Sequence, residues 1–283
     1  MDTATAPLPA WNPVDPLGEA LHFLHMEGAF YSRCEFAAPW GLALPRMEDC
    51  LMFHVLTAGR CWLEVDGSEP VVLEAGDLVL LPHGEGHRLV SEAGQPTQDL
   101  FALPREVQGE RYELLRMGGG GAPCSMVCGA VRFEHPAARQ LIRLLPTVLT
   151  VQATRSLRAD WMHSTLGLMA QEAREMRPGG EAVLTRLADI LVIQAIRLWL
   201  DQAPAARTGW LGALQDRQVG RAIAAIHRDP AHPWTVASLA AVAAVSRSAF
   251  AARFSERVGM PALQYVTQWR MHLALGWLRA RQG

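Results

Sequence analysis

Residues 233–279 decide the fold of the C-terminal part of the chain: PWTVASLAAVAAVSRSAFAARFSERVGMPALQYVTQWRMHLALGWLR. Thr235 and Ser246 are each placed to cap a short helix, because a hydroxyl oxygen there accepts hydrogen bonds from the first free N–H groups. Phe250 and Phe254, four residues apart, lie on one face of the second helix. Gly259 ends that helix. The stretch therefore predicts two short helices joined by a tight turn, which is the helix-turn-helix arrangement.

Three parts of this stretch also resemble a known family. They are the pattern S-R-S-x-F-x-x-x-F from Ser246, the pattern G-x-x-x-x-x-Y from Gly259, and W-R-M from Trp269. Together they resemble the first helix-turn-helix and the linker helix of AraC/XylS-type transcription regulators. Members of that family carry two such motifs, and this sequence ends at Gly283, where the second would begin. The resemblance implies DNA binding that is weak because the second motif is absent.

The charge distribution also favours a nucleic-acid partner for this end of the chain. Residues 214–283 contain nine arginines and three acidic residues, a net charge of +6. Residues 1–213 carry a net charge of −8, so the whole chain has a net charge of −2. A basic segment on an acidic body predicts that only this segment binds a polyanion.

Six residues of the second helix are predicted to face DNA. The resemblance places three small ones toward the major groove: Ser248, Ala251 and Ala252. A serine hydroxyl bonds to several base edges and an alanine contacts only a thymine methyl, so direct readout should be weak. Three arginines are interpreted as phosphate contacts, which position the protein without specifying sequence: Arg247, Arg253 and Arg257. Arg253 and Arg257 are equally compatible with ordinary surface charges.

Length and composition fit a two-domain globular protein. The chain has 283 residues, of which 50% are hydrophobic. Residues 1–13 have little pattern and are expected to form a flexible arm without the features of a signal peptide. The apolar stretch 187–200 contains Asp189 and Arg197 and is too short for a membrane span. Five cysteines without disulfide spacing favour a reducing, cytoplasmic location.

The N-terminal part predicts short strands separated by turn residues, over 50–56, 61–65, 71–73 and 78–81. This pattern is typical of a β-sandwich or small barrel. Gly76, Pro82, Gly84 and His87 match the second sequence motif of cupin barrels, G-x5-P-x-G-x2-H. The resemblance implies a cupin-like barrel with His87 facing its interior.

The first cupin motif is missing its metal ligands. Counting back from Gly59 puts Met52 at the carboxylate position, which does not suit an oxygen-activating iron. His54 lies two residues further along the predicted strand, so it should face the same side as Met52. His54 and His87 therefore form either a buried, hydrogen-bonded pair or, with a cysteine thiolate, a zinc site. No cofactor other than zinc is expected.

The five cysteines are interpreted either as small buried hydrophobic residues or as oxidant-sensitive thiols. They are Cys34, Cys50, Cys61, Cys124 and Cys128. Cys124 and Cys128 start a predicted strand with both sulfurs on one face. Some cupin-containing AraC-type regulators respond to oxidants through cysteines, and the resemblance extends that hypothesis here. Residues 91–123 are expected to form a flexible loop because of their glycines.

From His135 onward the apolar spacing changes to the helical period. Helices are expected from residue 136, over 161–176 and over 182–200. The last is apolar on more than one side, which predicts two packing partners: its own domain and a second subunit. It resembles the dimerisation helix of cupin-type AraC regulators, and the alternative is a core helix of a monomer.

These observations predict a multi-domain α+β chain in five parts. They are a flexible arm (1–13), a cupin-like sensor barrel (14–134), a helical dimerisation segment (135–203), a linker (204–213), and an all-α helix-turn-helix part without the second motif (214–283). The predicted function is a cytoplasmic, homodimeric, non-enzymatic transcription regulator. A small molecule, a metal or an oxidant would act on its cupin domain. The alternatives are a metal-dependent cupin enzyme, or a sensor that acts through protein contacts alone.

Overall fold

The computed structural model describes residues 26–109, 112–133, 136–152, 160–175, 177–202 and 209–280. The chain divides into two compact units, with one formed by residues 24–201 and the other containing residues 202–283. The predicted arm and residues 204–208 of the predicted linker lie outside the described residues.

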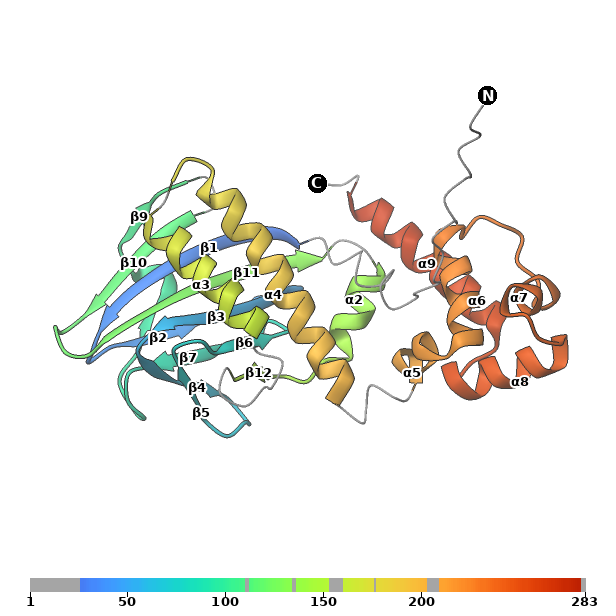
Figure 1. Cartoon of the computed structure of the whole chain (residues 1–283), viewed down its shortest axis with the longest axis horizontal. Helices are drawn as coiled ribbons and strands as arrows, with labels where there is room; N and C mark the ends of the chain where they lie inside the picture. Colours follow the sequence, from blue (N-terminus) through green and yellow to red (C-terminus); the bar gives the residue numbers. More distant parts are fainter. Residues whose placement is uncertain are drawn as a thin grey trace, which may run out of the picture. The chain divides into compact units, whose positions relative to one another are not determined.

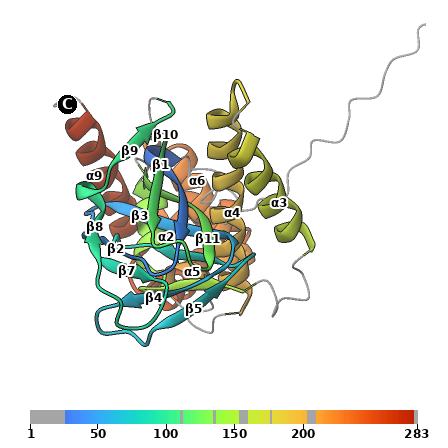
Figure 2. The same cartoon turned by 90° about the vertical axis from the view of Figure 1, so that its left-hand side faces the viewer.

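The N-terminal unit is built on two β-sheets (Figures 1 and 2). The larger sheet has the order β12 (Leu149–Val151), β6 (Leu78–Leu81), β3 (Cys50–Ala58), β11 (Pro123–Phe133), β1 (Met26–Ala37), β10 (Tyr112–Gly118) and β9 (Arg105–Val107). The smaller sheet has the order β5 (Val71–Glu74), β4 (Arg60–Val65), β7 (His87–Val90), β2 (Gly41–Leu44) and β8 (Gln98–Asp99). A 3-10 turn, η1 (Leu100–Ala102), follows β8.

The hydrophobic core lies between these two sheets. Alternate residues of β3 and β11, such as Met52 and Met126, point inward and meet residues of the smaller sheet, such as Leu63 and Leu89. This is the period-two pattern of a strand with one face in the core. The other face of the larger sheet is also buried, as Phe53 shows at 1% exposure, because helices α3 and α4 cover it (Figure 2).

The helices of this unit are α2 (Pro136–Arg143), α3 (Asp160–Glu175) and α4 (Gly180–Gln202). They correspond to the three predicted helices. The predicted boundary at residue 134 differs from the structure, because β12 returns from the helical segment and pairs with β6. The predicted loop over 91–123 also differs, since β8, β9 and all of β10 form there. Glycines in this stretch mark the ends of strands, and Gly118 ends β10 with a φ of 130°.

The C-terminal unit is all helical in its described part: α5 (Gly209–Gln215), α6 (Arg217–Arg228), α7 (Val236–Ala243), α8 (Arg247–Val258) and α9 (Ala262–Ala280). Its core holds Phe250, Phe254 and Trp269, which are at most 2% exposed. Helix α5 begins within residues predicted as linker, so the ordered C-terminal unit starts earlier than residue 214. No single helix among the described residues is long and apolar enough to cross a membrane.

Candidate functional site

The interior of the N-terminal unit places His54 and His87 against each other. His54 lies on β3 of the larger sheet and His87 on β7 of the smaller sheet, and both are buried. The antiparallel register of β3 and β11 sets Cys128 directly opposite His54. The two histidines and the thiol therefore come from three strands that are distant in sequence.

The turn before β7 needs glycine to hold this arrangement. Gly84 has a φ of 65°, and a Cβ atom there would lie 1.9 Å from the carbonyl oxygen of Met47. The backbone of Met47 donates a hydrogen bond to the Gly84 carbonyl at 2.9 Å. A side chain at this position would therefore break the contact that holds the turn against the segment before β3.

These groups form one hydrogen-bonded chain whose proton positions can be assigned. His87 Nδ1 lies 2.9 Å from the Glu85 carbonyl oxygen, which can only accept, so Nδ1 carries the proton. Neutral His87 then accepts at Nε2 from His54 Nε2–H at 2.7 Å. His54 Nδ1 is left to accept from the Cys128 thiol at 2.9 Å. The chain thus runs from Cys128 through His54 and His87 to Glu85.

Burial keeps both imidazoles neutral. Loss of solvent lowers the pKa of His54 well below its ordinary value, and the neighbouring His87 lowers it further. Burial lowers the pKa of His87 to about 4, although the Glu85 carbonyl opposes this shift. Burial likewise raises the pKa of Cys128. The neutral, hydrogen-bonded state is therefore the stable form of this chain near neutral pH.

The donors of this chain do not fit a metal ion. The two ring nitrogens of His54 point to different partners, so one ion cannot bind His54, His87 and Cys128 in their present orientations. Within the described ranges, no group of three or more histidine, cysteine or acidic side chains is arranged to hold a metal. The geometry matches the expected hydrogen-bonded pair and does not favour zinc.

Four of the five cysteines lie in the core between the sheets, and Cys50 lies outside that cluster. The sulfurs of Cys34 and Cys128 are 3.9 Å apart. All five cysteines are buried. A hydrogen bond from Cys61 lowers the pKa of Cys124, although burial opposes this shift. The same bond raises the pKa of Cys61. The core therefore contains two neighbouring thiol pairs, and within one of them the hydrogen bond shifts the two pKa values in opposite directions.

In the C-terminal unit, α7 and α8 meet at 87° across a three-residue turn. Thr235 and Ser238 form a capping box at the start of α7, and Ser246 caps α8 by accepting from the N–H of Ala249. Ala244 ends α7 in the left-handed conformation, with a φ of 57°. The predicted caps and turn are therefore all present.

The residues predicted to face DNA divide into two groups in the structure. Arg247, Ser248 and Ala252 are exposed, and Ala251 is half-buried. Arg253 instead donates two hydrogen bonds to Asp216 Oδ2, at 2.8 and 3.0 Å, and the Arg257 guanidinium lies 3.6 Å from the same oxygen. Arg253 and Arg257 are thus paired within their own unit, although their side chains remain 45% and 48% exposed.

Asp216 was not among the predicted site residues, although the sequence carries a signal for it. An aspartate directly before a helical segment is a typical cap, and its Oδ1 accepts from the backbone N–H groups of Gln218 and Val219 at the start of α6. Burial raises the pKa of Asp216, but hydrogen bonds from Arg253 and from these backbone groups outweigh burial and lower it. One carboxylate therefore caps α6 and neutralises arginines of α8.

Comparison with known proteins gives the family. The cupin family profile matches residues 15–201. A putative AraC-like transcription regulator of Streptomyces antibioticus is 34% identical over 270 residues, which cover 94% of this chain and 86% of that protein. This chain belongs to the AraC-like transcription regulators and carries a cupin domain.

More distant AraC-like regulators match over a similar extent. The RCS-specific activator RclR of Escherichia coli is 26% identical, over 92% of this chain and 82% of its own. Among solved structures, unsaturated fatty acid bound ToxT from Vibrio cholerae aligns with 90% of this chain and 83% of its own, with 10% identity and a TM-score of 0.36. Family membership therefore rests on the sequence matches.

Proposed function

We propose that this AraC-like regulator binds DNA through α8, in the cytoplasm, and that its cupin domain senses an effector. The observation that carries this proposal is the 87° junction of α7 and α8, with Arg247, Ser248 and Ala252 on the exposed surface of α8. A helix presented in this way enters a major groove, while arginines near its start contact phosphates. The net charge of +6 over residues 214–283 supports the same partner.

A DNA titration tests this function directly. We expect Arg247→Ala to weaken binding of a duplex of about 30 base pairs several-fold, because one phosphate contact is lost. The slope of log K against log salt concentration should become less negative by about one. Arg88→Ala is the matched control, since it removes an exposed arginine from β7 of the other unit, away from α4. Equal affinity of the wild type and Arg247→Ala, measured by fluorescence anisotropy, contradicts the proposal.

We further propose that α4 forms the contact of a homodimer. Val183 and Ile190 are 44% and 45% exposed on this helix, and Leu187 between them is half-buried. These residues are spaced by four and three positions, so they form one apolar stripe. Helix α3 lies beside α4 (Figure 1), and its Leu168 is also an exposed apolar residue, at 57% exposure.

For the effector, the thiol pairs favour an oxidant over a metal. A two-electron oxidant such as hypochlorite would convert the Cys124 thiolate to a sulfenic acid and release chloride. The Cys61 thiol would then attack that sulfur, expelling water and forming a disulfide between β4 and β11, which belong to different sheets. The support is the hydrogen bond from Cys61, which lowers the pKa of Cys124.

A metal-dependent cupin enzyme has less support, because the donors around His54 diverge. Stoichiometric iron or zinc in the purified protein, with turnover of a small substrate, would favour that alternative. A sensor acting through protein contacts alone would retain an effector response while binding no DNA.

A further inference from the structure

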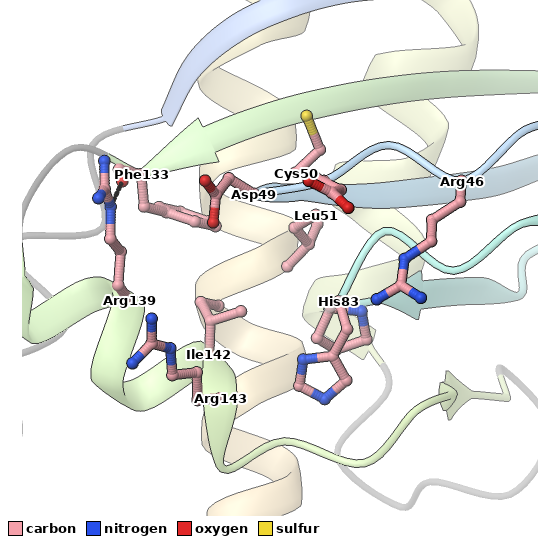
Figure 3. Close-up of a pocket in the computed structure, with 11 residues that line it drawn as sticks. Arg46, Asp49, Cys50, Leu51, His83, Phe133, Arg139, Ile142 and Arg143 are labelled. Carbon is pink, nitrogen blue, oxygen red and sulfur yellow. Dashed lines mark hydrogen bonds between the residues drawn. The ribbon is translucent and has the colours of Figure 1, made fainter.

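A cavity of about 280 Å³ lies at the edge of the β-sheets and is separate from the His54–His87 chain (Figure 3). Its walls come from the segment before β3, the turn after β6, the end of β11, and α2. The lining charges are three arginines, Arg46, Arg139 and Arg143, and two acids, Glu48 and Asp49. No motif in the sequence indicated this cavity.

The floor of the cavity is apolar and its rim is charged. Leu51, Phe133 and Ile142 lie in its middle part, and they are largely buried. Arg139 and Arg143 reach in from α2, while Arg46 and His83 lie on the opposite side (Figure 3). A ligand with an apolar body and one polar end matches this arrangement, because specificity in such pockets comes from a few polar groups around an apolar lining.

The arginines retain free donors for a ligand. Arg139 lines the edge of the cavity beside the end of β11, where its Nε donates to the Phe133 carbonyl at 2.8 Å and its two terminal nitrogens take no part in that bond. Arg143 lies one helical turn further on the same face of α2 and is exposed. Arg46 approaches Glu85 only to 3.9 Å. Guanidinium groups bind carboxylates through paired N–H donors. The α2 side of the cavity, which carries Arg139 and Arg143, therefore suits a carboxylate.

His83 is held as part of the wall. Its Nε2–H donates to the Leu145 carbonyl at 2.9 Å, which leaves Nδ1 as an acceptor. The three arginines and two acids together leave one net positive charge on the lining. The two acids disfavour a multiply charged anion such as phosphate.

We propose that this cavity binds a small organic monocarboxylate whose apolar body rests on Leu51, Phe133 and Ile142. The cavity is near the lower end of the usual range for ligand pockets, roughly 300–1,000 Å³, so the acid is the size of a single ring. The regulatory meaning of this ligand rests on the proposed function, whereas its binding does not. A bound acid joins α2 to the strands of the same unit.

Isothermal titration of the full chain, without DNA, tests this site with three probes: cyclohexanecarboxylate, the neutral analogue cyclohexylmethanol, and inorganic phosphate. We expect the carboxylate to bind at least about tenfold more tightly than the alcohol or phosphate, because only it pairs an apolar body with one negative charge. Arg143→Gln and Arg139→Gln should each weaken carboxylate binding about tenfold. Arg186→Gln, on α4 outside the cavity, should leave binding unchanged.

Three outcomes overturn the inference. They are no carboxylate binding up to about 10 mM, equal binding of the acid and the alcohol, and tighter binding of phosphate. Retained binding in Arg143→Gln would also contradict it, and far-ultraviolet circular dichroism of that exposed variant shows whether the fold is intact. Failure of DNA binding in a protein that still binds the acid would reject the proposed function and leave this site standing.

Discussion

At the scale of single residues, the thiols of the core give the first prediction. We expect mild hypochlorite to produce a Cys61–Cys124 disulfide, because the hydrogen bond from Cys61 favours the Cys124 thiolate, which is the reactive form. Cys124→Ser should abolish this product, and Cys50→Ser, which changes a thiol outside the core cluster, should not. Peptide mapping by non-reducing mass spectrometry measures both. Five free thiols after treatment of the wild type would rule out this oxidant mechanism.

The sequence predicted the positions of these residues better than their interactions. The strand period placed His54 on the same side as Met52, and the cupin motif pointed His87 to the interior. It did not show that His54 uses one nitrogen for Cys128 and the other for His87. That division depends on the register of β3 against β11 and on the backbone at Glu85, which local sequence does not determine. The metal interpretation stayed open for this reason.

At the scale of elements, α4 gives the second prediction. We expect Ile190→Arg to convert a homodimer into a monomer, because it places a charge in the middle of the exposed apolar stripe. Ala182→Arg adds the same charge about 100° around the helix from Val183 and should leave the dimer intact. Sedimentation velocity at several concentrations distinguishes the two. A monomeric wild type, or an unaffected Ile190→Arg, would identify α4 as a core helix of a monomer.

Helix caps and periods were predictable because they depend on neighbours a few residues apart. Thr235, Ser246 and Gly259 begin or end their helices as the sequence indicates. The cavity beside α2 was not predictable, because its arginines come from two segments that approach only in the folded sheet. Residues 149–151 were assigned to a helical segment, since a strand of three residues gives too little pattern to recognise.

At the scale of the whole molecule, the opposite charges of the two parts of the chain give a third prediction. Asp216→Asn keeps a side chain that caps α6 but removes the negative charge next to Arg253 and Arg257. We expect tighter non-specific DNA binding, with the slope of log K against log salt more negative by about one for each arginine freed. Asp66→Asn makes the same charge change on the acidic unit and should leave the slope unchanged. An unaltered slope for Asp216→Asn would place these arginines away from DNA.

The hydrogen-bonded chain of the core also has a direction. Its last acceptor is the Glu85 carbonyl, which has no proton to return, so the opposite orientation of every bond is unavailable. A proton arriving at the Cys128 end can be handed from donor to acceptor only as far as His87, because the Glu85 carbonyl has no proton to pass on. The chain therefore has a fixed polarity, and it ends at a group that cannot pass a proton on.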